Sequence, residues 1–132
     1  MKKKNCNCEY LVSRNSELRR EFINRLGGNW KNINEIFMEL SSMPASRFYI
    51  SEERAYALLK VKLRRGEWHP DILPRCREMM EEIYRRVNTL MDSDSSLSLK
   101  DAVFDVVNSP APGFYLSPRS IRTILYRYLK AS

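Results

Sequence analysis

Side chains that form disulfides or bind metals are scarce in this sequence. Its 132 residues include only three cysteines and one histidine. Cys6 and Cys8 are one residue apart and make an odd number with Cys76, which is a poor basis for a disulfide framework and fits a reducing compartment. His69 has no second histidine and no Cys-x-x-Cys motif beside it to complete a zinc site. We therefore expect no metal and no cofactor.

Long apolar segments are also missing. The apolar runs are only a few residues long, whereas a membrane-spanning helix needs about 20 residues. The sequence begins with Met1 and three lysines, but it lacks the apolar stretch of roughly 7 to 15 residues that follows in a signal peptide. We expect a cytoplasmic protein that does not associate with membranes.

No residue pattern indicates a catalytic site. A hydrolase triad needs a base beside a nucleophile, and the one histidine lies between Trp68 and Pro70, a context typical of a packed loop. The pair Gly27-Gly28 is not followed by the Lys-Ser or Lys-Thr of a phosphate-binding loop. We expect that the protein is not an enzyme.

Uncompensated positive charge is the first functional signal. The formal net charge is +7, while 43% hydrophobic and 30% charged residues are near the averages of globular proteins. Residues 109–132 hold four Lys or Arg and no acid, whereas residues 68–108 hold five against eight acids. A basic surface without neighbouring acids favours a polyanionic partner such as nucleic acid.

The sequence contains an internal duplication. Residues 44–51 (PASRFYIS) and 110–117 (PAPGFYLS) share Pro, Ala, Phe, Tyr and Ser in register when position 44 is aligned with position 110, an offset of 66. Asn32 then aligns with Ser98, and the apolar positions of the flanking segments also coincide. Two copies of one helix-loop-helix unit explain this match.

Helical periodicity and capping residues predict an all-α fold with about six helices in two duplicated three-helix halves, packed as a single compact domain. We expect a flexible basic segment at 1–15 and one helical domain at 16–132, with repeat 1 at about 16–66 and repeat 2 at about 70–130. Predicted helix starts are Ser16, Asn32, Ser51, Pro70-Asp71, Ser98 and Ser117-Pro118, and Gly66 is a predicted stop.

Apolar spacing also predicts which side chains form the core. The expected core positions are Leu18, Phe22, Ile23 and Leu26 in the first helix and Ala55, Leu58, Leu59 and Leu63 in the third. The segment 73–90 carries Leu73, Cys76, Met80, Ile83, Val87 and Leu90 at three-four spacing, which indicates either a core face or a homodimer seam. The two Phe-Tyr pairs could form an exposed recognition surface, but burial is favoured because a buried ring stabilises a fold by about 2 kcal/mol.

The candidate nucleic-acid-binding residues lie on the last helix, outside its apolar stripe. A charged helix face is usually just a solvated surface, but this one has no acids to neutralise it. A second candidate patch lies near the end of the third helix. The two sets are Arg119, Arg122, Thr123, Tyr126, Arg127 and Lys130 on the last helix, and Lys60, Lys62, Arg64 and Arg65 on the third.

Residues 98–130 resemble the second half of bacterial helix-turn-helix DNA-binding domains, through the segment Tyr115 to Leu125 (YLSPRSIRTIL) that follows a helix and a loop. The resemblance implies a capped recognition helix in which Arg119 and Arg122 contact base edges or phosphates. The chain also resembles short helical proteins of bacterial genomes and mobile elements.

Two functions remain open at this point. The first is a small basic DNA-binding protein with electrostatic contacts from the last helix, acting as a regulator or as an accessory protein of a mobile element. The alternative is a helical adaptor that binds a partner protein without nucleic acid, with a possible homodimer through the 73–90 helix.

Overall fold

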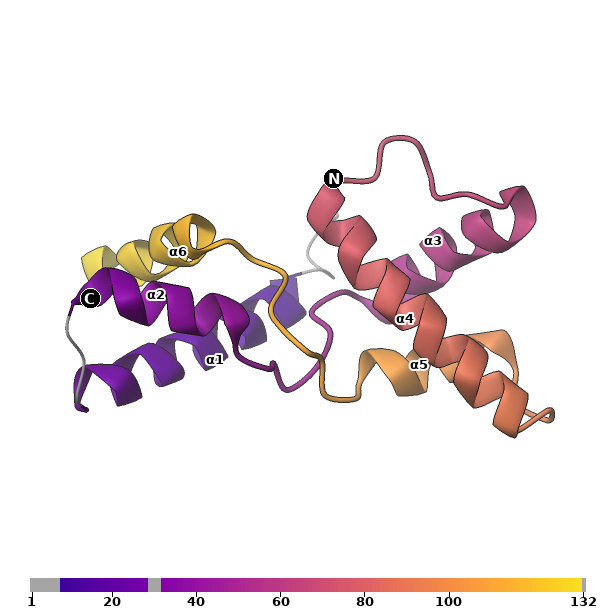
Figure 1. Ribbon diagram of the computed structural model, residues 1–132, viewed down its shortest axis with the longest axis horizontal. Coiled ribbons are helices and arrows are strands. Elements are labelled where there is room, and N and C mark those ends of the chain that lie inside the picture. The colour runs from indigo at the N-terminus through magenta and orange to yellow at the C-terminus, as the bar shows by residue number, and fades with distance from the viewer. Residues whose placement is uncertain (1–7, 29–31, 132) are drawn as a thin grey trace. The chain divides into compact units, whose positions relative to one another are not determined.

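The computed structural model describes residues 8–28 and 32–131, and the side chains of residues 10–28 and 32–127. Within these ranges the chain is all helical and forms no strand (Figure 1). The helices are α1 (Cys8–Leu26), α2 (Ile33–Ser42), α3 (Glu52–Arg65), α4 (Pro74–Ser93), α5 (Leu99–Val107) and α6 (Pro118–Ala131). The predicted all-α class with six helices is confirmed.

Most of the predicted helix boundaries are correct because short polar side chains cap the helices. The Oγ atoms of Ser51 and Ser98, and the Oδ1 atom of Asn32, each accept the backbone N–H three residues later at 3.1 Å. Gly66 ends α3 with a φ of 83°, and its N–H donates to the Lys62 carbonyl at 2.8 Å.

Two predicted starts are wrong. α1 begins at Cys8 rather than at Ser16, so residues 8–15 are helical and do not belong to a flexible segment; residues 1–7 of that predicted segment lie outside the described residues. α4 begins at Pro74, which occupies the first helical position, and not at Pro70-Asp71. Between them, the N–H of Ile72 donates to the His69 carbonyl in a turn at 3.1 Å.

The chain divides into two compact units. Unit 1 comprises residues 1–45 and 111–132 and contains α1, α2 and α6, which pack on one another (Figure 1). Unit 2 comprises residues 46–110 and contains α3, α4 and α5, which also pack on one another. Each unit therefore takes two helices from one repeat and its third helix from the other, an exchange that the sequence pattern did not predict.

A backbone pair in unit 1 joins two positions that the duplication makes equivalent. Ala45 and Ala111 are 66 residues apart, and each donates its N–H to the other's carbonyl at 3.0 Å in an isolated antiparallel bridge. Both alanine side chains are buried. The bridge joins the two places where the chain leaves unit 1, at residue 45, and returns to it, at residue 111.

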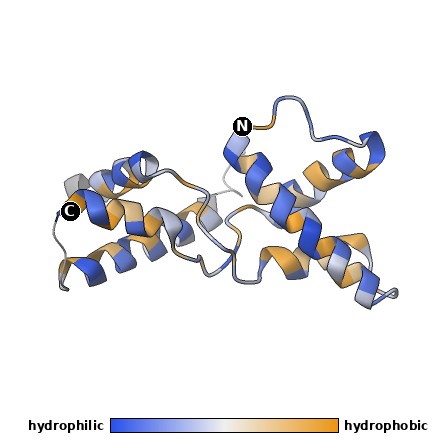
Figure 2. Cartoon of the chain, viewed as in Figure 1, coloured by the Kyte–Doolittle hydropathy of each residue, from blue (hydrophilic) through white to orange (hydrophobic). Residues whose placement is uncertain are grey.

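Each unit has its own apolar core, formed by the inward stripes of three amphipathic helices (Figure 2). In unit 1, the rings of Phe22 and Phe37 stack with centroids 5.7 Å apart, and the fully buried side chains include Leu18, Ile36, Leu40, Ile121 and Leu125. In unit 2 they include Phe48, Leu59, Met80, Ile83, Val87, Val103 and Val107.

The Phe-Tyr loops turn inward, as the sequence favoured. Phe48 and Phe114 are both buried, each in the core of its own unit, and Tyr49 is buried as well. The hydroxyl of Tyr49 shares a hydrogen bond with Ser46 Oγ at 3.0 Å. Tyr115 is half-buried and has a φ of 58°, so the second loop is not an exact copy of the first.

Four predicted core positions are exposed instead. Ile23 and Leu26 lie on the outer side of α1, Leu63 is about half exposed on α3, and Leu73 precedes α4 rather than joining its stripe. By contrast, the α4 positions Met80, Ile83 and Val87 are buried in the core of unit 2. The core alternative for this stripe is therefore confirmed, whereas the homodimer stays a prediction.

Candidate nucleic-acid interface

α6 is held on unit 1 by its apolar side. Ile121 and Leu125 are fully buried against α1 and α2, and the ring of Tyr126 meets the edge of Phe37 with centroids 6.1 Å apart. The helix begins at Pro118, where the Ser117 hydroxyl accepts the N–H of Ser120 at 3.1 Å. Because the buried stripe and the cap fix the rotation of the helix, its opposite side must face solvent.

The outward side of α6 carries the predicted arginines. Arg119, Arg122 and Arg127 are exposed and, at 100° per residue, fall on the side away from Ile121 and Leu125. No ion pair or hydrogen bond among the described residues joins any of these three side chains to an acid. We call these three residues the α6 arginine face.

Two other predicted residues lie beside the α6 arginine face. The exposed Thr123 donates its hydroxyl to the Arg119 carbonyl at 3.1 Å, which leaves the oxygen lone pairs facing solvent. Tyr126 is half-buried, and the Arg122 guanidinium lies 5.2 Å from its ring centroid. This cation-π contact orients Arg122 without neutralising it. The side chain of Lys130, also predicted, lies outside the described residues.

The excess charge of the protein belongs entirely to unit 1. By sequence, unit 1 contains twelve Lys or Arg against five Asp or Glu, whereas unit 2 contains eleven of each. Unit 2 is therefore neutral and unit 1 carries the whole +7. A surface potential that attracts polyanions is concentrated on the unit that contains the α6 arginine face.

The second predicted patch belongs to unit 2, and one of its members, Lys62, makes contacts within the protein. Lys62 donates to the Gly66 carbonyl at 3.3 Å, and its ammonium lies 5.5 Å from the Trp68 ring centroid and 5.7 Å from that of Tyr84. Lys62 thus fastens the 66–68 turn to α4. The remaining three members, Lys60, Arg64 and Arg65, are exposed on α3, and the Lys60 ammonium lies 5.1 Å from the Tyr56 ring centroid.

The repeat shows that the α6 arginine face is specific to one unit. At the offset of 66, Arg119, Arg122 and Arg127 correspond to Glu53, Tyr56 and Val61 on α3. The three equivalent positions on α3, in unit 2, are therefore acidic, aromatic and aliphatic. The arginines are not needed for the packing that both units share.

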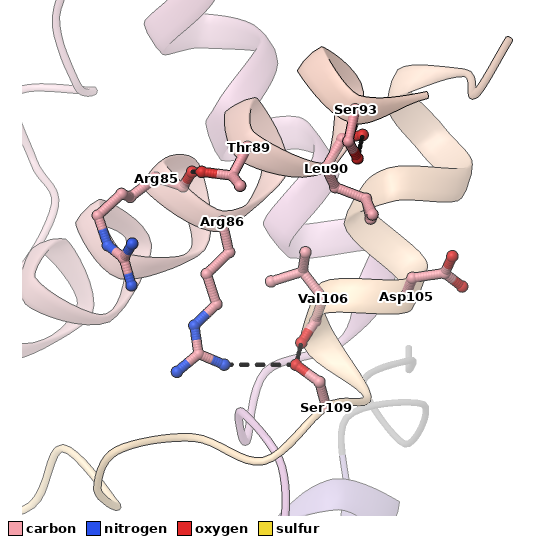
Figure 3. A pocket seen from close by; sticks show the side chains of 8 residues that line it. All are labelled: Arg85, Arg86, Thr89, Leu90, Ser93, Asp105, Val106 and Ser109. Atoms are coloured by element: carbon pink, nitrogen blue, oxygen red, sulfur yellow. Dashed lines mark hydrogen bonds between the residues drawn. The ribbon is translucent and has the colours of Figure 1, made fainter. Parts of the chain in front are cut away.

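A cavity of about 340 Å³ lies between α4 and α5 in unit 2 (Figure 3). Its floor is apolar, with Leu90 and Val106. Of the charged side chains that line it, Arg85 and Arg86 are paired with Glu82, whereas Asp105 takes part in no ion pair among the described residues. Arg86 donates to Glu82, to the Ser109 hydroxyl at 3.4 Å and to the Pro110 carbonyl at 2.7 Å. Hydrogen bonds from Arg85 and Arg86 lower the pKa of Glu82, so this ion-pair cluster fastens the 109–110 segment to α4.

His69, the one histidine, takes part in a turn. Its Nδ1 accepts the backbone N–H of Asp71 at 3.1 Å, but its side chain is exposed, so the residue lies in a turn without being packed as the sequence predicted. Across the described part of the chain, no three His, Cys, Asp or Glu side chains gather where they could hold a metal ion. None of the helices described is both long enough and apolar enough to cross a bilayer.

Sequence reasoning missed the outer side of α1. Val12 and Ile23, eleven residues apart, are each more than half exposed there, and Ile23 lies beside the exposed Arg19 and Arg20. The signal that could have shown this is helical geometry, because Ile23 lies about 140° around the helix from the core residue Leu18.

Comparisons of the chain with models of protein families, with curated proteins and with solved structures gave no match.

Proposed function

We propose that this protein binds nucleic acid, DNA in the first place, by electrostatic contacts from the α6 arginine face. The observation that carries the proposal is that Arg119, Arg122 and Arg127 are exposed without an acidic partner among the described residues, on the unit that holds the whole excess charge. A guanidinium group with all its donors facing solvent suits a phosphate oxygen.

The packing of α6 favours phosphate contacts over reading of base edges. In the helix-turn-helix domains that residues 98–130 resemble, the last two helices pack on each other. Here α5 belongs to unit 2, and α6 packs on α1 and α2 of unit 1. Because the supporting helices differ, we propose that α6 binds the phosphate backbone of DNA. We also propose that the protein acts in the cytoplasm, as a regulator or as an accessory protein of a mobile element.

The test is a salt titration with two matched variants. The first replaces Arg119, Arg122 and Arg127 by alanine. The control replaces Arg54, Arg75 and Lys100, three exposed cations of unit 2, and so removes the same net charge. Binding to a fluorescent 20-base-pair duplex is followed by anisotropy between 50 and 200 mM salt.

Each phosphate contact contributes about 0.9 to the slope of log K against log salt for duplex DNA. Loss of three contacts therefore lowers the slope by up to about 2.7, which corresponds to a roughly 40-fold smaller change in affinity over this fourfold range of salt. The control should keep the slope of the wild type. Equal slopes for both variants, or no binding by the wild type, would refute the proposal, and single-stranded DNA and RNA of equal length distinguish the type of nucleic acid.

A further inference from the structure

The two units have the same internal plan, so each position in one unit has an equivalent in the other. The offset of 66 relates the starts of all three pairs of helices, which are Cys8 and Pro74 for α1 and α4, Ile33 and Leu99 for α2 and α5, and Pro118 and Glu52 for α6 and α3. A space that one unit fills and the other leaves open can therefore be found by comparing equivalent side chains.

Unit 1 fills the space between its helices with aromatic rings. Phe22 of α1 is 2% exposed, and its ring stacks on that of Phe37 of α2 with centroids 5.7 Å apart. The ring of Tyr126, from α6, meets the edge of Phe37 with centroids 6.1 Å apart. Each helix of unit 1 thus contributes one ring to a single cluster.

Unit 2 has no ring at the three equivalent positions. They are occupied by Asn88, Val103 and Lys60, and Asn88 is exposed where its counterpart in unit 1 is buried. The nearest ring on the same helix, that of Tyr84, pairs edge to face with Trp68 at a centroid distance of 6.1 Å. The ring that α1 supplies in unit 1 is therefore not replaced in unit 2.

A pocket of about 280 Å³ lies beside Asn88, between α3, α4 and α5. Its apolar wall includes Leu59 and Leu63 of α3, Met91 of α4 and Leu99 of α5. Leu63 is 49% exposed on this wall, although its spacing on α3 predicted a core residue. We call this space the α3–α4 pocket.

The α3–α4 pocket is large enough for one aromatic ring with a short substituent. An aliphatic cavity of about 150 Å³ is sufficient to bind benzene. Water in such a pocket finds few hydrogen-bond partners on the wall, so its displacement by an apolar ring is favourable. In unit 1 the ring of Phe22 occupies the equivalent place, which shows that three helices of this plan accept a ring there.

The polar side chains of the α3–α4 pocket are hydrogen-bond acceptors at its mouth. Asn88 and Asp92 lie one helical turn apart on α4, and both are exposed. No ion pair or hydrogen bond among the described side chains involves either of them. Their carboxylate and amide oxygens can both accept from a protonated amine.

The charge at the mouth is negative. Among the described side chains that line the α3–α4 pocket, only Asp92 is charged. Lys62 lies 5.7 Å from the Tyr84 ring centroid but does not line the pocket, and its ammonium donates to the Gly66 carbonyl at 3.3 Å. Because a carboxylate repels phosphate, nucleic acid is a poor occupant of this pocket.

We propose that the α3–α4 pocket binds a small aromatic amine. The ring packs against the aliphatic wall, and the protonated amino group lies at the mouth, where it donates to the side-chain oxygens of Asp92 and Asn88. The site belongs to unit 2 alone and uses no residue of the α6 arginine face. This proposal and that of DNA binding can therefore fail separately.

The test is an NMR titration of the methyl-labelled full chain at pH 7, without DNA. The probe is 2-phenylethylamine, which is protonated at this pH. Three other molecules separate the ring from the charge. They are 2-phenylethanol with a ring and no charge, phenylacetate with a ring and a negative charge, and butylamine without a ring.

Saturable shifts are expected at the methyl groups of Leu59, Leu63 and Leu99. The amine should bind more tightly than the alcohol, and the alcohol more tightly than phenylacetate, because only the amine pairs with the carboxylate at the mouth. Butylamine should cause no saturable shift, since it lacks the ring that covers the apolar wall.

Two variants test the ring space and the carboxylate separately. Asn88→Phe places on α4 the ring that unit 1 has at the equivalent position, and it should abolish the saturable shifts by filling the pocket. Asp92→Asn should weaken binding of the amine about two- to fivefold, as for loss of an exposed ion pair, and leave binding of the alcohol unchanged. The matched control is Thr89→Phe, because Thr89 is the next residue, is also exposed and lines the cavity between α4 and α5 instead.

Four results would overturn the proposal. A wild type that shows no saturable shift with the amine has no such site. Equal affinity for the amine, the alcohol and phenylacetate, or an Asp92→Asn variant that binds the amine like the wild type, excludes the proposed role of the carboxylate. Undiminished binding by Asn88→Phe places the ligand elsewhere, and loss of binding in Thr89→Phe places it in the cavity between α4 and α5.

Discussion

The exchange of third helices predicts how the protein behaves when its chain is cut. A site for a specific protease is inserted between Gly66 and Glu67, in the connection from α3 to α4, and the purified protein is cleaved there. One fragment then contains α1, α2 and α3, and the other contains α4, α5 and α6. Each three-helix unit needs a helix from both fragments.

The size of the effect follows from the side chains that the exchanged helices bury. α6 buries Ile121 and Leu125 in unit 1, and α3 buries Leu59 in unit 2, all to 1% exposure or less. Burial of a large aliphatic side chain contributes about 1.5 to 3 kcal/mol, so separation of the fragments loses roughly 5 to 9 kcal/mol from these three alone. The helices that these side chains cover would be exposed as well. Because a dissociation constant of 1 µM corresponds to only about 8 kcal/mol, the two fragments should stay bound to each other at micromolar concentration.

The assay is gel filtration with light scattering of the cleaved protein at micromolar concentration. We expect one species with the mass of the uncut chain in buffer, and two smaller species in concentrated urea, which verifies that cleavage is complete. Two separately folded half-size species in buffer would refute the reasoning, because they would show that each repeat packs its own three helices.

Three further predictions concern single residues. Gly66→Ala should destabilise the protein by about 1 kcal/mol in urea unfolding. The cause is the φ of 83°, which is unfavourable for any side chain, and not a clash, because no atom lies within 4 Å of the added Cβ. An unchanged midpoint would contradict the left-handed cap. Lys62→Ala should lower the free energy of unfolding by about 0.5 to 1 kcal/mol through loss of its cation-π contacts. It should leave the affinity for DNA unchanged. Weaker DNA binding at unchanged stability would show instead that Lys62 contacts phosphate. The pKa of Glu82 is lowered by Arg85 and Arg86, so its stabilising effect is present above the unfolded pKa of about 4.3 and is lost as the pH falls through the folded pKa. Glu82→Gln should therefore destabilise the protein at pH 7 but much less at pH 3, and an equal loss at both values would show that the ion pairs are not responsible.

Local signals in the sequence were enough to predict the helices. Asn32, Ser51 and Ser98 mark helix starts because their side chains satisfy a backbone N–H that has no partner within the helix. Gly66 marks an end because it adopts a left-handed backbone at little cost. The errors at α1 and α4 arose where such a signal lay inside a helix, as at Ser16, or in the turn before it, as at Pro70.

The assignment of helices to units could not be predicted from the repeat. An exchanged and an unexchanged arrangement bury the same stripes, since Leu59 and Leu125 occupy equivalent positions and fit equivalent cores. The choice depends on the path of the connections 43–51 and 109–117, and apolar spacing carries no information about that path. The exposed arginines of α6 could be predicted, because the apolar stripe fixes which side of a helix is buried.

The most direct test of the proposed function is an NMR titration of the ¹⁵N-labelled protein with a short DNA duplex at low salt. The side-chain Nε–Hε signals of Arg119, Arg122 and Arg127 report contact with phosphate at the atoms concerned. We predict that these signals and the backbone amides of α6 shift together as DNA is added, and that they return when salt is raised. Shifts confined to α3, α4 or α5, or no shift in any of the three arginine signals, would contradict the account.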